Sequence, residues 1–258
     1  IIILFSFNSN ILYNNIEYIT NIDRIFLLFI NYISLIIFIY SDKYLNLDPY
    51  KFYFFFLLFS FLFILKSILS FNSFYSLFFF WELLGFFSFL LIKFWNYNLI
   101  NNKFSFKALI WNRVGDIFFI YLLILFNTNS SFISSFLNNN SLFYFIFGIK
   151  SVQFLGLLWL LSAMVTPTPV SALLHSSSMV CIGWYLTYKM NINMDNNLLI
   201  YFLLFSLFLI SFFDLKKLLA LSTSFNLFLI FISNKYIGFI HMLNHGLFKS
   251  LLFLFSGF

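Results

Sequence analysis

Long apolar runs, one after another, constrain this chain more than any other feature of its sequence. Runs with few or no charges can be read at 25–40, 52–71, 73–92, 109–126, 141–164, 167–188, 197–213, 217–233 and 236–258. A helix needs about 20 apolar residues to cross the hydrocarbon core of a bilayer. In lipid, such runs must satisfy their own backbone hydrogen bonds, which a helix does. The sequence therefore predicts an all-α, polytopic membrane helix bundle with about nine transmembrane helices.

The composition excludes a water-soluble globule and argues against a redox or nucleotide site. Hydrophobic residues make up 62% of the chain and charged residues 9%, too few to cover a soluble domain. One cysteine, Cys181, excludes an internal disulfide and an iron-sulfur cluster held by this chain alone. The net charge of +6 is scattered between apolar runs, unlike the basic stripe of a nucleic-acid-binding protein. We expect membrane lipids as its surroundings, no nucleic acid as a partner, and no cofactor or metal bound by this chain.

The choice of apolar residues indicates a gene of low G+C content. The chain has 45 Phe and 15 Tyr but only 8 Gly and 3 Pro. Phe, Tyr, Ile, Asn and Lys have A/T-rich codons, whereas Gly, Ala and Pro have G/C-rich ones. This bias is common in organellar genomes and favours an organelle-encoded membrane protein.

Polarity separates a short N-terminal segment from the predicted crossings. Residues 1–24 mix polar and apolar positions and are predicted to form an N-terminal surface segment. Residues 25–190 hold most of the predicted crossings, and 191–258 hold the last three. The connection 93–107 carries three lysines, so the positive-inside rule places it on the matrix or cytoplasmic side.

Pro167 and Pro169 interrupt an otherwise continuous apolar stretch. Proline cannot continue a helix from within but is favoured in its first turn, so a helix must break or begin here. Irregular backbone at membrane depth is tolerated only where protein or a water-filled cavity surrounds it. The proline pair is therefore a candidate functional element.

Glu82 and Lys150 lie inside apolar runs. An unpaired charge there costs about 3 kcal/mol or more, so such residues usually mark ion or proton pathways. Both are predicted to carry protons. The alternative is a purely structural ion pair between two helices.

Arg113 and Asp116 are three residues apart and can share one helix face as a local pair. They lie near the start of the run 109–126, so we expect them to be less deeply buried than Glu82. They belong either to the same pathway or to a surface pair at the membrane boundary.

His175 follows the proline pair, and His241, His245 and Lys249 recur at intervals of four. That interval places the last three on one helix face, about 6 Å apart along the axis. Histidine titrates near neutral pH, which suits a proton relay through water. Alternatively, His175 is a hydrogen-bonded packing residue, and His241 with His245 are metal ligands, although no further ligand residue lies nearby.

Asp214 and Lys216 join two predicted crossings. The simplest interpretation is a solvated turn, and a supporting role in the pathway is the alternative.

Several of these motifs, in this order and spacing, resemble one known family. They are Trp81-Glu82-Leu83-Leu84-Gly85, Asn112-Arg113-Val114-Gly115-Asp116, Pro167 to His175, Asp214 to Lys217, and His241 to Gly257. Together they resemble the antiporter-like membrane subunits of respiratory complex I, and among these the chain 5 branch more than the paralogous chains 2 and 4. The resemblance covers roughly residues 30–258.

The resemblance implies a fold of two inverted five-helix repeats with discontinuous helices, as in secondary transporters. The first repeat would occupy about 52–190, with Lys150 on its discontinuous helix, and 191–258 would hold the first three helices of the second. Residues of the implied proton pathway are Glu82, Asp116, Lys150, His175, His241, His245 and Lys249. Possible supporting residues are Arg113, Pro167, Pro169, Asp214 and Lys216.

The resemblance also implies partners and a location. The chain would be a subunit of the NADH:ubiquinone reductase in the mitochondrial inner membrane, beside a chain 4-type subunit. NADH, FMN, iron-sulfur clusters and ubiquinone would act in the complex, with no redox site in this chain. We also expect a second polypeptide to supply helices that this sequence lacks.

The predicted function is proton translocation along buried Glu, Lys and His residues, driven by remote redox chemistry that alters the attraction between Glu82 and Lys150. The alternatives are a sodium/proton antiporter subunit and a scaffold of the membrane arm that does not pump.

Overall fold

The computed structural model describes residues 21–70, 73–95, 99–128, 141–153, 156–189 and 214–257. All regular secondary structure in these ranges is helical, which confirms the predicted all-α class. The elements are α2 (Asn21–Tyr44), α3 (Lys51–Ser70), α4 (Phe74–Ile92), α5 (Leu99–Thr128), α7 (Ser141–Lys150), α8 (Gly156–Ala163), α9 (Thr168–Ser171), the π-helix η2 (Ala172–Ser177), α10 (Met179–Lys189), α12 (Leu215–Ile232) and α13 (Lys235–Phe255).

Membrane crossing is supported by helix length and composition. Within the described ranges, five helices are long and apolar enough to span a bilayer, namely α2, α3, α4, α12 and α13. Helix α5 has 30 residues, about 45 Å at 1.5 Å per residue, against a hydrocarbon core of about 30 Å. The chain is therefore a multi-pass membrane protein.

Helix boundaries differ from the predicted runs in three places. The run 141–164 holds two short helices, because α7 ends at Lys150 and α8 begins at Gly156, and such an interruption fits the discontinuous helix that the family resemblance implied. Helix α5 begins at Leu99, so much of the predicted connection 93–107 is helical. Helix α2 begins at Asn21, inside the predicted surface segment. In the last two cases polar residues led us to expect irregular structure, although those stretches contain neither proline nor glycine to stop a helix.

Two further predictions lie outside the described residues. They are the surface position of residues 1–20 and the crossing at 197–213. Both stay predictions.

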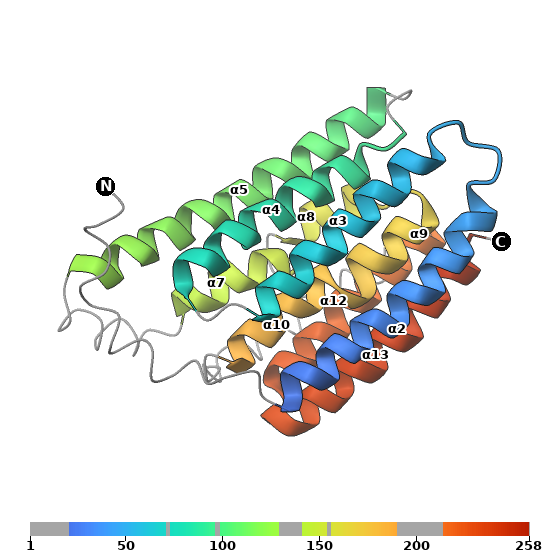
Figure 1. Cartoon of the computed structure of the whole chain (residues 1–258). Coiled ribbons are helices and arrows are strands. Elements are labelled where there is room, and N and C mark those ends of the chain that lie inside the picture. The colour runs from blue at the N-terminus through green and yellow to red at the C-terminus, as the bar shows by residue number, and fades with distance from the viewer. Residues whose placement is uncertain are drawn as a thin grey trace.

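The helices pack side by side in one bundle (Figure 1). Helix α3 packs against α4, α4 against α5, and α13 against both α2 and α12. The π-helix η2 contacts α2, α9, α10, α12 and α13. The residues that follow the proline pair are therefore enclosed by protein.

Serine hydroxyls inside the bundle are satisfied by the helix that carries them. Ser67, Ser88 and Ser224 donate to the carbonyl oxygens three residues earlier, at 2.6, 2.7 and 2.7 Å. Burying a hydroxyl without such a bond would cost about 1–3 kcal/mol. These serines therefore fit an apolar interior.

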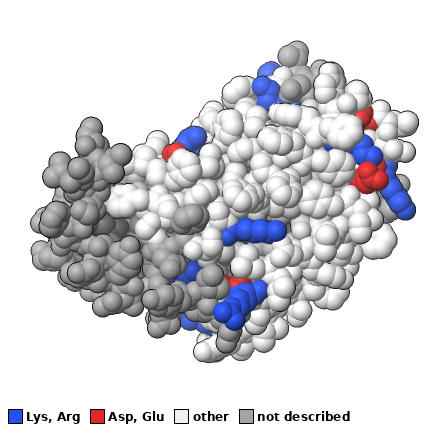
Figure 2. All heavy atoms as spheres, viewed as in Figure 1, with Lys and Arg blue, Asp and Glu red and all other residues white. Residues whose placement is uncertain are grey.

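On the face seen in Figure 2, the described surface is mostly uncharged, and Lys, Arg, Asp and Glu form small separate groups. Large apolar side chains such as Leu28, Phe59 and Phe255 are each at least two-thirds exposed. In water such a surface would promote aggregation, whereas in a bilayer these side chains contact lipid.

Gly183 sets the distance between α10 and α7. A Cβ atom there would lie 2.7 Å from the Phe147 carbonyl oxygen and 2.9 Å from Ser151 Cβ, closer than Cβ atoms pack. The two helices can approach this closely only because residue 183 has no side chain.

We predict that Gly183→Ala lowers the thermal unfolding temperature of the purified protein in detergent. The methyl group must push against a backbone oxygen, and overpacking of this kind costs about 1–3 kcal/mol. Gly148→Ala is the matched control, since its added methyl meets one atom, Gln153 Cβ, at an ordinary 3.5 Å. Equal unfolding temperatures for the two variants would contradict this packing.

Candidate functional site

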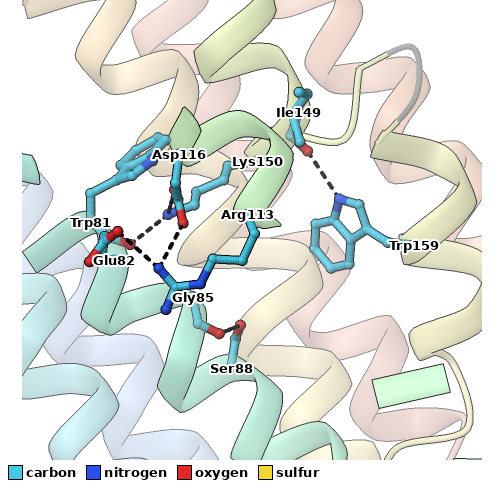
Figure 3. Close-up of polar contacts among 9 residues, drawn as sticks. All are labelled: Trp81, Glu82, Gly85, Ser88, Arg113, Asp116, Ile149, Lys150 and Trp159. Carbon is cyan, nitrogen blue, oxygen red and sulfur yellow. Dashed lines mark hydrogen bonds and ion pairs between the residues drawn. The ribbon is translucent and has the colours of Figure 1, made fainter. Parts of the chain in front are cut away.

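Four ionisable side chains form a chain of ion pairs across α4, α5 and α7 (Figure 3). Arg113 Nη1 lies 2.9 Å from Glu82 Oε1 and 3.7 Å from Asp116 Oδ2. On the other side of Asp116, its Oδ1 lies 3.5 Å from Lys150 Nζ. Charges therefore alternate in sign from Glu82 to Lys150.

This ion-pair chain runs from the surface of the bundle to its interior. The side chains of Arg113 and Glu82 are 46% and 33% exposed, while those of Asp116 and Lys150 are 3% and 0% exposed. A change of charge at the outer end can reach the buried ammonium through groups already in contact.

The Lys150 ammonium has several partners. Nζ donates to the Trp81 carbonyl oxygen at 2.5 Å and lies 4.0 Å from the centroid of the Trp81 ring. Lys150 is also the last residue of α7, where the partial negative charge of the helix C-terminus favours a cation. One carboxylate, one carbonyl and one aromatic face thus stabilise a charge without access to solvent.

The Trp81 ring beside Lys150 belongs to a cluster of three aromatic rings. Trp81, Phe119 and Phe147 contact one another edge to face, with centroids 5.6–6.2 Å apart. They come from α4, α5 and α7, the three helices that carry the ion-pair chain. Their ring contacts therefore help fix the spacing of the helices that carry the charged residues.

The backbone breaks directly after Lys150. Val152 has a φ of 63°, the left-handed region that a β-branched residue rarely adopts. The backbone N–H of Gln153 donates to the Gly148 carbonyl oxygen at 2.7 Å. The indole Nε1–H of Trp159 donates to the Ile149 carbonyl oxygen at 3.0 Å. These bonds satisfy carbonyls that the end of α7 would leave unpaired.

Gln153 ties this break to the second part of the bundle. Its Nε2 lies 3.4 Å from the Ser224 carbonyl oxygen on α12 and 3.3 Å from the Ser151 carbonyl oxygen. The Gln153 side chain therefore connects the break between α7 and α8 both to the residue that follows α7 and to helix α12.

The proline pair behaves as predicted. Pro167 is the N-cap of α9, and Pro169 lies in its first turn. Lys216 Nζ donates to the Thr166 carbonyl oxygen at 3.3 Å, so this lysine holds the chain just before the new helix begins.

The turn at Asp214 is only partly a solvated turn. Asp214 is exposed and pairs with Lys217 at 2.5 Å. Lys216, by contrast, points toward the break at Thr166. A supporting role of this turn in the pathway stays a prediction.

His175 lies in the π-helix and is fully buried. Its ring centroid is 5.7 Å from that of Trp159. Among the described residues, neither ring nitrogen has a hydrogen-bond partner. Whether His175 relays a proton or is a packing residue stays a prediction.

His241, His245 and Lys249 lie on the single continuous helix α13. His245 and Lys249 are buried, and His241 is half-buried. Both nitrogens of His245 lack a partner within the described ranges, while Lys249 Nζ donates to Ser222 Oγ on α12. No group of three His, Cys, Asp or Glu in the described part of the chain could hold a metal ion.

The structure thus brings some predicted residues together and keeps others apart. Glu82, Arg113, Asp116 and Lys150 form one connected group. Since the imidazoles of His175 and His245 have no partner in the described residues, no direct hydrogen bond links them to that group or to each other.

Two expectations about the connected group were wrong. Asp116 is buried, because Leu99 and not residue 109 begins α5, so Asp116 lies well inside the helix. The carboxylate in contact with Lys150 is that of Asp116, while Glu82 is paired with Arg113. Glu82 and Lys150 are therefore not in direct contact, and Arg113 and Asp116 lie between them.

Sequence reasoning missed a second buried ion pair. Asp23 on α2 and Lys189 on α10 are 3.3 Å apart, and their side chains are 3% and 17% exposed. The nearby ring of Phe26 stacks on Tyr185 with centroids 4.7 Å apart. Asp23 lies just before the apolar run that begins at residue 25. We did not treat it as a candidate for burial because residues 1–24 were predicted to form a surface segment.

Comparison with known proteins gives one family. The family described as NADH:quinone oxidoreductase/Mrp antiporter, TM, matches residues 72–258. NADH-ubiquinone oxidoreductase chain 5 of Ceratotherium simum is 37% identical over 242 residues, covering 84% of this chain and 40% of that protein. The chain 5 proteins of Wickerhamomyces canadensis and Hylobates lar are 36% and 39% identical, covering 96% and 84% of this chain and 43% and 40% of their own lengths. The chain spans about two fifths of the length of these relatives.

We predict that Asp116→Asn destabilises the protein more than Glu82→Gln. Neutralising Asp116 leaves the Lys150 ammonium without its carboxylate in a site closed to solvent, and breaking a buried pair costs about 3–5 kcal/mol. Neutralising Glu82 affects a partly exposed pair and leaves Arg113 beside Asp116. Thermal unfolding of both variants in detergent measures the difference, and a larger loss for Glu82→Gln would contradict the burial order.

Proposed function

Since the chain belongs to the NADH:quinone oxidoreductase/Mrp antiporter membrane family, we propose that it translocates protons as part of a chain 5-type subunit of respiratory complex I. The observation that carries this proposal is the ion-pair chain from the half-exposed Glu82 and Arg113 to the fully buried Lys150. It links a surface that a neighbouring subunit can reach to a base that can hold or release one proton.

In the proposed mechanism, the ion-pair chain transmits a change in electrostatic attraction from one side chain to the next. It does not carry the proton itself. When Arg113 is held by Glu82, Asp116 is free to neutralise the Lys150 ammonium. When a charge change in a neighbouring subunit draws Glu82 away, Arg113 attracts Asp116 instead, and the weakened contact with Lys150 favours release of its proton. Restoring Glu82 reloads the lysine.

The magnitudes are sufficient for this mechanism. Unit charges 3.5 Å apart, the distance between Lys150 and Asp116, interact by about 5 kcal/mol at an effective dielectric constant of about 20. Moving one elementary charge against 100 mV costs about 2.3 kcal/mol. Partial loss of a single contact is therefore comparable with the work of pumping one proton.

The proton released by Lys150 passes to His175 and then to His245 and Lys249. His241, which is half-buried, lies on α13 beside His245 and belongs to the same route. Water must bridge these steps, because the buried imidazoles have no protein partner in the described ranges. Buried polar atoms are normally hydrogen-bonded to protein or water. Unpartnered imidazoles thus support a hydrated route.

The proline break supports the route by holding irregular backbone next to His175. Pro167 and Pro169 start a new helix, and Lys216 fixes the residue before them. Asp214 belongs to the adjoining turn and holds the neighbouring lysine, Lys217. We assign these four residues to the support of the route and not to proton transfer.

We propose that a chain 4-type subunit covers the outer end of the ion-pair chain. Glu82 lies in the middle of α4 and Arg113 in the middle of α5, yet both are partly exposed. Charges facing lipid at that depth are costly, so a polar surface of a neighbouring subunit is the more stable surrounding.

We further propose the mitochondrial inner membrane as the location, with NADH, FMN, iron-sulfur clusters and ubiquinone in other subunits of the complex. The A/T-rich residue usage and the chain 5 relatives support this location. The prediction of a second polypeptide stays a prediction, since 258 residues can equally be a segment of a longer chain.

The family description also covers Mrp antiporters, which keeps a sodium/proton antiporter as the second candidate. The relatives named here carry the name NADH-ubiquinone oxidoreductase chain 5, which favours the complex I function. Sodium-dependent transport by the purified protein would reverse this preference.

We predict that Lys150→Met abolishes the share of proton translocation that depends on this subunit in the assembled complex reconstituted into liposomes. Electron transfer from NADH to a soluble acceptor should continue, because the lysine has no part in redox chemistry. Lys107→Met is the matched control, an exposed lysine on α5. Unchanged pumping by an assembled Lys150→Met complex would overturn the proposed function.

A further inference from the structure

Helix α2 contacts both elements that carry the fully buried histidines of the proposed route. It packs against the π-helix η2, which holds His175, and against α13, which holds His245. Figure 1 shows α2 and α13 side by side along one edge of the bundle. Another face of α2 carries the exposed side chains of Leu28 and Leu35, which suits contact with lipid. Helix α2 therefore lies between the histidine-bearing elements and the outer surface of the bundle.

The ion pair of Asp23 and Lys189 fixes the beginning of α2 to the end of α10. Asp23 lies in the first turn of α2, and Lys189 is the last residue of α10. Their charged groups are 3.3 Å apart, and both side chains are largely shielded from solvent. A shielded pair is only weakly screened by salt, and separating its charges is costly. This end of α2 is therefore held in place by electrostatic attraction.

Stacked aromatic rings continue from this ion pair into the bundle. Phe26, three residues after Asp23, stacks on Tyr185 of α10, with ring centroids 4.7 Å apart and 12° between the ring planes. Tyr185 is four residues before Lys189, so the two share one face of α10. Phe26 also stacks on Phe29, with centroids 6.1 Å apart. We call the buried rings of Phe26, Tyr185 and Phe29 the aromatic ladder.

The inner end of the aromatic ladder lies against the backbone of α13. A Cβ atom added to Gly246 would overlap Phe29 Cζ and would lie 3.2 Å from Phe29 Cε1. The edge of the Phe29 ring thus fills the space that a side chain at Gly246 would need. Gly246 directly follows His245, so Phe29 supports α13 at the level of that histidine.

We propose that Asp23 and Lys189 are positioning residues for His245, on which they act through the aromatic ladder. The inference deepens the proposed function and rests on it, because it concerns the histidines of the proton route. Neither Asp23 nor Lys189 carries the proton. With the ion pair intact, α2 holds α13 and η2 at a fixed separation, which keeps the spacing between His175 and His245 constant. Without the ion pair, the aromatic ladder shifts and this spacing changes.

The test is Asp23→Asn, which removes the charge and keeps the size of the side chain. Asp42→Asn is the matched control, because Asp42 pairs with Lys51 at 2.6 Å near the opposite end of α2 and its side chain is 65% exposed. Both variants are studied in the assembled complex, reconstituted into liposomes. Proton translocation is divided by the amount of assembled complex, since a purely structural role would lower the yield of complex and leave the rate per complex unchanged.

We expect the share of translocation that depends on this subunit to fall at least about tenfold in Asp23→Asn, since misplacing reacting groups by about 1 Å can lower a rate by about a hundredfold. Asp42→Asn should stay near wild type. Asp23→Glu keeps the charge and should retain most of the rate. A wild-type rate per complex in Asp23→Asn, or an equal loss in Asp23→Glu, would overturn the positioning role.

A second pair of variants tests the contact between the ladder and α13, and it applies even if Asp23→Asn does not assemble. Gly246→Ala should lower translocation per complex, because its methyl group displaces the Phe29 ring. Adding Phe29→Leu should restore part of the rate, since leucine lacks the ring atoms that the methyl group meets. No recovery in the double variant would overturn the role of this contact.

The positioning role and the proposed function can fail separately. Loss of pumping in Lys150→Met, together with wild-type pumping in Asp23→Asn, would leave the proposed function standing and overturn the positioning role. Wild-type pumping in both variants would overturn both.

Discussion

The buried ammonium of Lys150 is the charge on which the rest of the structure depends. A fully buried cation is stable only beside compensating groups, and here three helices supply them. Helix α4 gives the Trp81 carbonyl and ring, α5 gives Asp116, and α7 ends at the lysine itself. The packing of these helices and the stability of the buried charge therefore depend on each other, because moving one helix would leave the Lys150 ammonium without a compensating group.

Irregular backbone is the second requirement. The chain leaves helical geometry at Val152 and again before Pro167, and it forms a π-helix around His175. Each departure is held by a specific side chain, with Trp159 at the first and Lys216 at the second. Ionisable residues thus lie where backbone groups are freed from the helix and where water can enter a membrane protein.

The sequence predicted the helical class, the membrane setting and the proline break, because apolar runs and prolines act locally. It located the ionisable residues and the pair of Arg113 with Asp116. It did not identify the partner of Lys150, since whether Asp116 or Glu82 contacts Lys150 depends on how three helices are rotated. The break after Lys150 was implied by the family resemblance alone, because no proline or glycine lies at Val152 to mark it locally.

The central claim is that Glu82 influences Lys150 through Arg113 and Asp116. The direct test is a double-mutant cycle of Glu82→Gln and Lys150→Met, measured as the free energy of unfolding in mixed micelles, in wild type and again with Arg113→Gln. We predict that removing Arg113 changes the coupling energy between residues 82 and 150 by at least about 0.5 kcal/mol. An unchanged coupling energy, or additive effects in both backgrounds, would contradict the account.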